Sequence, residues 1–293
     1  MKYFGRVLTA MVTPFDDNLN VDYDRAGLLA KRLADNGSDG IVVSGTTGES
    51  PTLTVEEKIN LYKTVCKAVP EGTSVIAGTG SYDTRASIEL TKEAEEAGVD
   101  GIMLVVPYYN RPTQEGLYYH FSEIASSTKL PIIIYNVPSR TSLSIDPKTV
   151  GRLSKIDNIA AIKEASNDVE KITEMKSICP DDFIFYSGND SFILPMLSLG
   201  GHGVISVASH IAGNEIQDMI SSFINNDVKK AWEMNLKLFP LFRAIFLLSN
   251  PIPVKKALNL TGFDVGGVRP PLLSSMGEKE LGALRDALKI LGR

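Results

Sequence analysis

The strongest constraint on the fold is a short apolar run that returns eight times along the chain. Each run has the length of a strand and is almost continuously hydrophobic, which is typical of a strand buried on both faces. The runs cover residues 7–12, 40–44, 74–78, 101–106, 131–135, 159–163, 183–186 and 203–207. Hydrophobic runs of this kind indicate a parallel sheet with helices packed on its faces.

Amphipathic stretches with helical periodicity follow the first seven runs. They cover residues 23–36, 55–68, 85–97, 114–126, 147–154, 168–178 and 191–199. Thr54 with Glu57 matches a capping box, and Gly37 and Gly98 stand where helices are expected to end. A repeated strand–helix unit requires right-handed crossovers. Eight units therefore predict an α/β fold, a closed (β/α)₈ TIM barrel.

The pattern changes after about Asn214, where helical stretches follow one another with no strand between them. They cover residues 215–225, 228–249, 253–260 and 278–291. The first is expected to complete the outer ring of helices. We therefore predict a barrel with the catalytic site over residues 1–225 and a small C-terminal helical region over residues 226–293.

Composition narrows the possible partners. The 293 residues carry a formal net charge of -5, and the Lys and Arg residues are scattered. This distribution argues against nucleic acid and against a lipid surface as partners. No segment approaches the ~20 apolar residues of a membrane span, and the first residues lack a signal-peptide pattern. With two distant cysteines, Cys66 and Cys179, and no disulfide framework, we expect a cytoplasmic protein that acts on small molecules.

Lys163 is the most informative single residue. It follows Ile159-Ala160-Ala161-Ile162 and so ends a buried strand, at the barrel end where active sites lie. Burial lowers a lysine pKa, and a neutral amine can attack a ketone to form an imine. From its position alone, an ion pair with Glu164 or another strand-end carboxylate is an equally open interpretation.

Other candidates end neighbouring strands. Thr46 and Thr47 lie between two glycines at a strand-to-helix turn, where hydroxyl and N–H groups can hold a carboxylate or simply cap the helix. Tyr135 ends the fifth run and could pass protons or only pack its ring. Arg140 follows on a loop, where it could bind a substrate carboxylate or be an ordinary surface residue.

Signatures of bound cofactors are incomplete. Gly78-Thr79-Gly80 lacks the rest of a dinucleotide fingerprint, and no phosphate-binding Gly-Lys-Ser/Thr is present. The three histidines, His120, His202 and His210, are not spaced to place two ligands on one helix face. We predict a mechanism that needs no cofactor and no metal.

These motifs resemble those of the dihydrodipicolinate synthase family, whose superfamily includes N-acetylneuraminate lyase and 2-keto-3-deoxygluconate aldolase. The similarity runs from residues 5–15 to residues 250–254. The strand-end lysine and Gly-Thr-Thr-Gly-Glu are common to the superfamily. Gly-Thr-Thr-Gly-Glu-Ser, Pro-Tyr-Tyr-Asn-Arg-Pro and Tyr-Asn-Val-Pro-Ser-Arg-Thr together are more specific to the synthases.

The resemblance implies roles for the catalytic residues. Lys163 would form the imine with pyruvate. Tyr135 would relay protons, and Thr47 would link it to Tyr109, which in this family reaches in from the neighbouring subunit. Thr46 and Thr47 would also hold the pyruvate carboxylate.

The second substrate implied by the resemblance is L-aspartate 4-semialdehyde. Arg140 would orient its carboxylate, while Gly188 and the main chain of Ile205 would line the site. The product would be 4-hydroxy-tetrahydrodipicolinate, an intermediate of lysine and diaminopimelate biosynthesis. The family's usual assembly is a homotetramer built as a dimer of dimers.

Two alternatives remain open at this point. One is a pyruvate-dependent aldolase or lyase acting on a sugar acid, which would keep Lys163 and Tyr135. Arg140 argues against a wall built to bind hydroxyl groups. The other is a barrel that binds a keto acid without catalysis, which would leave the proton-relay residues without a role.

Lysine inhibition is expected to be weak or absent. Family members inhibited by lysine carry an allosteric site built partly from histidines and a glutamate. The corresponding positions here hold Val55, Lys58 and Ala86. The remaining lining residues of this degenerate site would be Ser81, Tyr82 and Tyr108.

Overall fold

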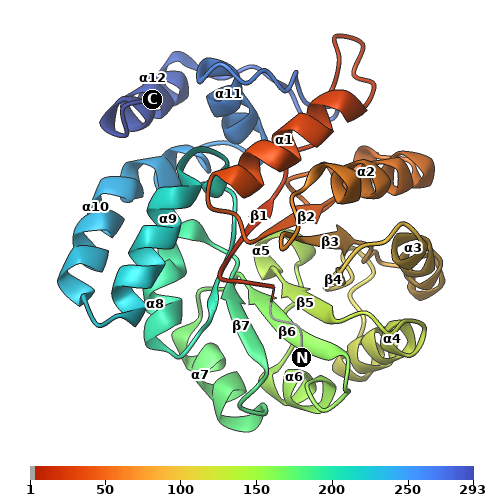
Figure 1. The fold of residues 1–293 in the computed structure, drawn as a ribbon. Coiled ribbons are helices and arrows are strands. Elements are labelled where there is room, and N and C mark those ends of the chain that lie inside the picture. The colour runs from red at the N-terminus through yellow and green to blue at the C-terminus, as the bar shows by residue number, and fades with distance from the viewer. Residues whose placement is uncertain (1–3) are drawn as a thin grey trace.

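The computed structural model describes residues 4–293 and contains a closed barrel (Figure 1). Its parallel strands pair in chain order, and β1 is hydrogen-bonded to β8. The strands are β1 (Val7–Ala10), β2 (Gly40–Val43), β3 (Ser74–Gly78), β4 (Gly101–Val105), β5 (Ile132–Asn136), β6 (Ile159–Glu164), β7 (Ile184–Ser187) and β8 (Gly203–Ser206). Each overlaps one of the eight apolar runs, so the predicted TIM barrel is confirmed.

Helices form a ring around the strands, as Figure 1 shows. The ring consists of α1 (Tyr23–Asp35), α2 (Val55–Ala68), α3 (Thr84–Glu96), α4 (Gln114–Ser126), α6 (Pro147–Leu153), α7 (Val169–Ile178), α8 (Ile193–Ser198) and α9 (Ser209–Ile224). Short helices lie in three loops: η1 (Ser50–Thr52), α5 (Pro138–Thr141) and η2 (Asp190–Phe192). The predicted C-terminal helices are α10 (Val228–Ala244), α11 (Ile252–Leu260) and α12 (Glu278–Ile290).

Local capping signals were good guides to helix ends. The Thr54 side chain accepts from the Glu57 N–H, and the Glu57 carboxylate accepts from the Thr54 N–H, which completes the capping box. Gly37 and Gly98 adopt φ of 92° and 89° just after α1 and α3. This left-handed conformation suits glycine and ends both helices as predicted.

Two boundaries in the C-terminal half differ from the prediction. Helix α9 begins at Ser209 rather than at residue 215, with a kink at Ala212 that interrupts its periodicity. Helix α10 ends at Ala244 rather than at residue 249. The chain then turns through Asn250 to Pro251, and a residue before proline is disfavoured in helical conformation.

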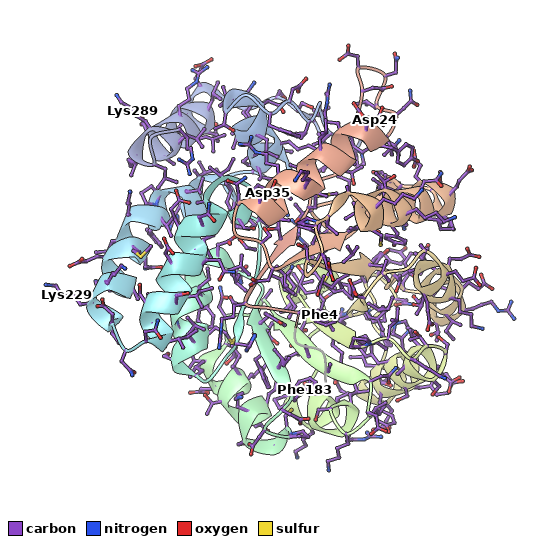
Figure 2. The ribbon with its side chains drawn as sticks, in the orientation of Figure 1. Phe4, Asp24, Asp35, Phe183, Lys229 and Lys289 are labelled. Atoms are coloured by element: carbon purple, nitrogen blue, oxygen red, sulfur yellow. The ribbon has the colours of Figure 1, made fainter. Side chains whose placement is uncertain are left out.

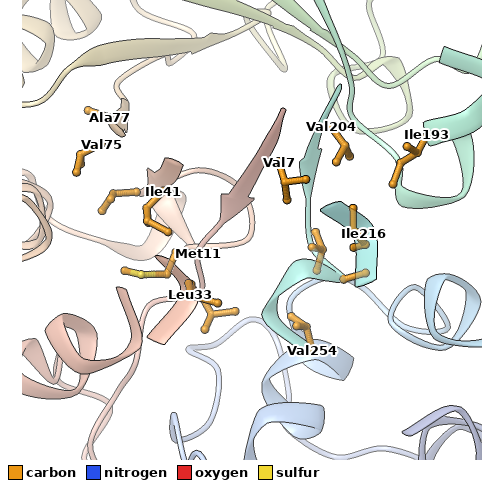
Figure 3. Packing of buried hydrophobic residues seen from close by; sticks show 14 of the residues in the cluster. Val7, Met11, Leu33, Ile41, Val75, Ala77, Ile193, Val204, Ile216 and Val254 are labelled. Atoms are coloured by element: carbon orange, nitrogen blue, oxygen red, sulfur yellow. The ribbon is translucent and has the colours of Figure 1, made fainter. Parts of the chain in front are cut away.

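The core has an inner and an outer layer. Inside the barrel, Leu8, Val42, Ile76 and Ile133 belong to one buried cluster. Outside it, strand residues pack against the helix ring. Figure 3 shows Val7 of β1 and Val204 of β8 beside Ile216 of α9, with Val254 of α11 nearby. The last helices therefore share the outer hydrophobic core with the barrel.

Phe4 fills the amino-terminal end of the barrel. It is 1% exposed and packs in the inner cluster. A Cβ at Gly101 would lie 2.5 Å from the Phe4 ring, so glycine makes room for it. Figure 2 shows Phe4 near the centre of the barrel, whereas the labelled Asp24, Lys229 and Lys289 lie on its periphery. Because Phe4 occupies this end, a functional site is expected at the opposite end of the barrel, where the strands have their carboxyl ends.

Within residues 4–293, no helix combines the length and apolar character required to cross a membrane.

Candidate active site

Lys163 and Tyr135 are direct neighbours across two parallel strands. They are register partners in the β5–β6 ladder, so both side chains point to the same side of the sheet. Lys163 is 5% exposed and Tyr135 is 6% exposed. The Lys163 Nζ lies 4.3 Å from the centroid of the Tyr135 ring. The structure thus brings the two predicted catalytic side chains into contact inside the barrel mouth.

The environment of Lys163 favours a neutral amine. Burial lowers its pKa to about 8, and the positive charge of Arg140 acts in the same direction, while Asp190 opposes the shift. At pH 7 roughly one amine in ten is then neutral, far more than for an exposed lysine. A fraction of the side chains is therefore nucleophilic near neutral pH.

Glu164 does not serve as the ion-pair partner of Lys163. Its carboxylate accepts hydrogen bonds from Asn136 Nδ2 at 2.8 Å and from the Ser166 N–H at 2.6 Å. Adjacent strand residues point to opposite faces, which explains why the two side chains diverge. The ion-pair interpretation of Lys163 with Glu164 is therefore wrong.

Asp190 supplies the negative charge near Lys163. It is 1% exposed and accepts from the Ser206 hydroxyl, and its other oxygen accepts from the Val207 and Ala208 N–H groups at 3.2 Å each. These bonds fix the carboxylate behind the lysine. We did not single out Asp190 from the sequence, although it closes the Ser187-Gly188-Asn189-Asp190 segment after the seventh run.

Most predicted site residues line one cavity at the carboxyl end of the barrel. Its lining includes Thr46, Thr47, Tyr135, Arg140, Lys163 and Gly188, together with Val137, Ser139, Ala165, Asn189, Val207, Phe246 and Asn250. Ile205 is not part of this lining and lies in the inner cluster of the barrel. Tyr109 is also absent from it, because its side chain is 92% exposed on a loop where φ is 74°.

The two threonines have different partners. Burial raises the Tyr135 pKa to about 12, and a hydrogen bond with the Thr46 side chain and the charge of Arg140 limit the rise. The Thr47 hydroxyl instead accepts from Asn250 Nδ2 at 2.8 Å. Thr46, rather than Thr47, is therefore the threonine next to the Tyr135 phenol in this chain.

Asn250 connects both sides of the cavity. Besides the bond from its side chain to Thr47, its main-chain carbonyl oxygen accepts from Arg140 Nη2 at 3.4 Å. Arg140 itself lies in the short helix α5, which begins at Pro138 directly after β5. Asn250 comes from the turn between α10 and α11, and no local pattern in the sequence connects it with the barrel mouth.

Of the residues considered for a regulatory site, Tyr108 lies beside the catalytic residues. Tyr108 lines a second cavity that also includes Thr46 and Tyr135. Its ring meets that of Tyr82 edge to face, with 5.3 Å between centroids. The Ser81 hydroxyl donates to the Asp83 carbonyl at the start of α3.

This geometry combines a buried amine with a lowered pKa, a phenol with a hydroxyl partner, and a guanidinium group around one small cavity. An amine so placed can form an imine with a keto acid. The phenol and the threonine can move protons, and the guanidinium can hold a carboxylate.

Comparison with known proteins agrees with this chemistry. The model of the dihydrodipicolinate synthetase family matches residues 3–291. The 4-hydroxy-tetrahydrodipicolinate synthase of Heliobacterium modesticaldum is 55% identical over 289 residues, covering 99% of this chain and 96% of the relative.

Solved structures extend the comparison to the whole fold. The dihydrodipicolinate synthase of Bacillus anthracis is 50% identical, with a TM-score of 0.96 and coverage of 99% of both chains. The chloride-inhibited enzyme of Acinetobacter baumannii, solved in complex with pyruvate, is 38% identical, with a TM-score of 0.95 and coverage of 99% of both chains. The chain belongs to the dihydrodipicolinate synthetase family.

Proposed function

We infer that this chain condenses pyruvate with L-aspartate 4-semialdehyde to give 4-hydroxy-tetrahydrodipicolinate, a lyase reaction of lysine and diaminopimelate biosynthesis. The observation that carries this function is the buried Lys163 amine, with a pKa lowered to about 8, against Tyr135 at the barrel mouth. The names of the similar proteins favour this reaction over cleavage of a sugar acid.

The first half of the reaction forms a covalent intermediate. The Lys163 amine attacks the ketone carbon of pyruvate, and water leaves to give an imine. The protonated imine withdraws electrons, so a proton can leave the methyl group and an enamine forms. Tyr135, together with Thr46, is placed to carry these protons.

The second half makes the new carbon–carbon bond. The enamine carbon attacks the aldehyde carbon of the second substrate, and the aldehyde oxygen takes a proton. The amino group of the second substrate then attacks the imine carbon. The bond to Lys163 breaks, the lysine leaves as an amine, and the ring closes. No metal or cofactor takes part in these steps.

Substrate recognition follows from the cavity walls. We assign the pyruvate carboxylate to Thr46 and Thr47, whose hydroxyl and N–H groups come from the turn after β2. Arg140 receives the carboxylate of the aldehyde substrate. We assign Gly188 to the wall near Lys163. A contact with the main chain of Ile205, which lies outside this lining, stays a prediction.

We further propose that the active form is a cytoplasmic homotetramer, a dimer of dimers in which Tyr109 completes the partner's site. Two exposed apolar surfaces support two kinds of contact. One contains Tyr109 (92% exposed) and Tyr82 (55% exposed). The other is a stripe along α10, made of Val228, Trp232, Leu236 and Phe239 at 41–55% exposure. We retain residues 1–225 as the catalytic barrel and 226–293 as the helical region that carries this stripe.

Weak or absent inhibition by lysine is expected from the residues near Tyr82. Lys58 presents an ammonium group where a lysine ligand would bring its own positive charge, and Val55 and Ala86 offer no carboxylate. Steady-state assays with added lysine should therefore show less than half inhibition at millimolar concentrations. Clear inhibition at sub-millimolar lysine would contradict this assignment of the site.

The proposed function can be tested by trapping the imine. Sodium borohydride added with pyruvate should reduce the imine and leave a pyruvate-sized adduct on Lys163, identified by peptide mass spectrometry. Lys163→Ala should take up no adduct and lose the synthase activity. A wild-type protein that takes up no adduct would overturn the mechanism. A sugar acid turned over in place of aspartate semialdehyde would instead change only the assigned substrate.

A further inference from the structure

A buried network of charges meets the threonine turn at Glu49, which does not line the catalytic cavity. Glu49 follows Thr47 by two residues, and its side chain is 1% exposed. Its Oε1 lies 2.8 Å from the Nζ of Lys255, which is 2% exposed and comes from α11. Its Oε2 accepts from the Arg269 N–H at 2.9 Å. The C-terminal segment that contains Lys255 and Arg269 thus holds the turn through both carboxylate oxygens of Glu49.

The same segment fixes the cations that surround Glu49. Lys255 also donates to the Gly267 carbonyl at 2.6 Å. The Arg269 guanidinium bonds both oxygens of Glu57 at 2.6 and 2.9 Å. Lys255 and Arg269 both lie over the Phe15 ring, at 4.0 and 4.6 Å from its centroid. Every charged group in the network therefore has a fixed partner.

The turn is tight enough to transmit the position of Glu49 to the threonines. The Glu49 N–H donates to the Thr46 carbonyl at 3.1 Å, and the Ser50 N–H donates to the Gly45 carbonyl at 3.2 Å. Glu49 has a φ of 57°, in the left-handed region that a residue with a side chain seldom adopts. A displacement of the Glu49 carboxylate would therefore move the backbone that carries Thr46 and Thr47.

Stability alone is a poor reason for such a pair. A buried ion pair is often no more stabilising than apolar side chains of the same volume, because both charges lose their hydration. The ion pair does fix the position of the Glu49 carboxylate, because a charge-assisted hydrogen bond restricts an atom more closely than apolar packing does. The network is also out of reach of the reacting atoms, because Glu49 and Lys255 do not line the catalytic cavity.

We propose that Glu49, clamped by Lys255 and by the main chain of Arg269, is a positioning residue that sets the threonine turn for pyruvate recognition. This inference rests on the proposed function, since it assigns the pyruvate carboxylate to that turn. It makes the C-terminal segment part of the machinery for the first substrate. Arg140, to which we assign the second substrate, lies on the loop after β5 and makes no direct contact with Glu49, Lys255 or Arg269 among its hydrogen bonds.

The decisive variant is Glu49→Gln, which keeps the shape and one acceptor but removes the charge. We expect kcat/KM for pyruvate to fall roughly tenfold or more, as for other displaced substrate-holding groups. The pyruvate concentration that gives half-maximal borohydride trapping should rise by a similar factor. The value of kcat/KM for aspartate semialdehyde should fall less than the value for pyruvate, because it reports the second half-reaction and Arg140 has no direct contact with Glu49.

A second variant separates positioning from folding, since Glu49→Gln leaves the Lys255 ammonium buried without a counter-charge. The double variant Glu49→Gln/Lys255→Met removes both charges and should regain thermal stability. Its kcat/KM for pyruvate should remain low, because neither new side chain fixes the turn. Recovery of pyruvate kinetics together with stability would overturn the proposal.

Glu57→Gln is the matched control. It weakens the other ion pair of Arg269, at the start of α2, without touching Glu49. It should lower thermal stability and leave both kcat/KM values near wild type. A fall in kcat/KM for pyruvate as large as that of Glu49→Gln would overturn the proposal. The wild-type trapping reaction runs beside each variant, so that failure of imine formation itself is recognised as failure of the proposed function.

Discussion

Lys163 shows how one side chain acquires its chemistry from its position. It ends a strand that is buried along its whole length, and the loss of hydration lowers its pKa to about 8. The two nearby charges act in opposite directions, with Arg140 lowering the pKa and Asp190 raising it. The amine therefore loses its proton within about one pH unit of neutrality, far more readily than an exposed lysine.

This balance predicts a pH dependence of imine formation. Below the pKa of about 8 the amine is protonated and cannot attack, so the rate constant should rise with pH and level off above 8. Arg140→Gln removes a positive neighbour, which should raise the Lys163 pKa and move the inflection to higher pH. Stopped-flow mixing with pyruvate across a pH series would measure both profiles.

The control for the pH experiment is Arg285→Gln, an exposed change on α12 far along the chain from the site. It removes the same charge without acting near Lys163, so its profile should match wild type. An inflection that stays fixed in Arg140→Gln would show that the guanidinium does not act on the amine.

At the scale of elements, the loop after β5 depends on a buried amide. The side-chain amide of Asn136 donates to Glu164 Oε2 at 2.8 Å, and its Oδ1 accepts from the Ile145 N–H at 3.2 Å. These bonds tie both ends of the segment that contains α5 and Arg140. The segment is therefore held by two neighbouring strands rather than by its own short helix.

Asn136→Ala should lower the free energy of unfolding by about 2–3 kcal/mol, because it leaves one buried oxygen of Glu164 and the Ile145 N–H without these partners. The value can be measured by urea denaturation. Ser144→Ala is the control, since it removes a 3.3 Å contact with the same amide and a 3.4 Å bond to the Ile145 carbonyl but leaves the Asn136 bonds to Glu164 and to the Ile145 N–H. We also expect kcat/KM for aspartate semialdehyde to fall in Asn136→Ala, and an unchanged value would argue that Arg140 is held independently.

The strands and most helices could be predicted from the sequence because their signals are local. A strand covered on both faces is continuously apolar, and a helix on the outer ring shows one apolar face. Lys163 stood out because a charge ended such a strand. Helix α5 was missed because four residues are too few for a periodic pattern.

The supporting residues could not be predicted, because their partners lie far away in the chain. Asn250 and Thr47 are 203 positions apart, and Asn250 has no local feature that points to the barrel mouth. The distinction between Thr46 and Thr47 depends on the backbone of the turn, where Ser44 and Glu49 both have positive φ. Identical neighbouring residues give no hint of which one faces Tyr135.

At the scale of the whole molecule, the exposed Tyr109 predicts that the active site is shared between subunits. Tyr109→Phe should lower turnover while imine trapping continues, because only a proton relay is lost. Lys163→Ala should be inactive on its own. Mixed dimers of the two variants contain one site with both an intact lysine and an intact partner tyrosine.

Subunit exchange between the two variants should therefore restore activity. Random pairing gives about a quarter of all sites the full set of residues. Activity can be followed after refolding the variants together, and each variant refolded alone is the control. A mixture no more active than the sum of its components would show that Tyr109 does not act across the interface.

The C-terminal clamp also has a consequence for how the protein is made. The main-chain N–H of Arg269 donates to Glu49 across 220 positions of the chain. The first half of the barrel therefore leaves the ribosome long before Arg269 has been synthesised. During that interval the nascent polypeptide has a lysine and threonines but no fixed receptor for the keto acid. A product that stops short of α11 would lack both Lys255 and Arg269, so we expect it to bind pyruvate poorly even where the barrel strands have formed.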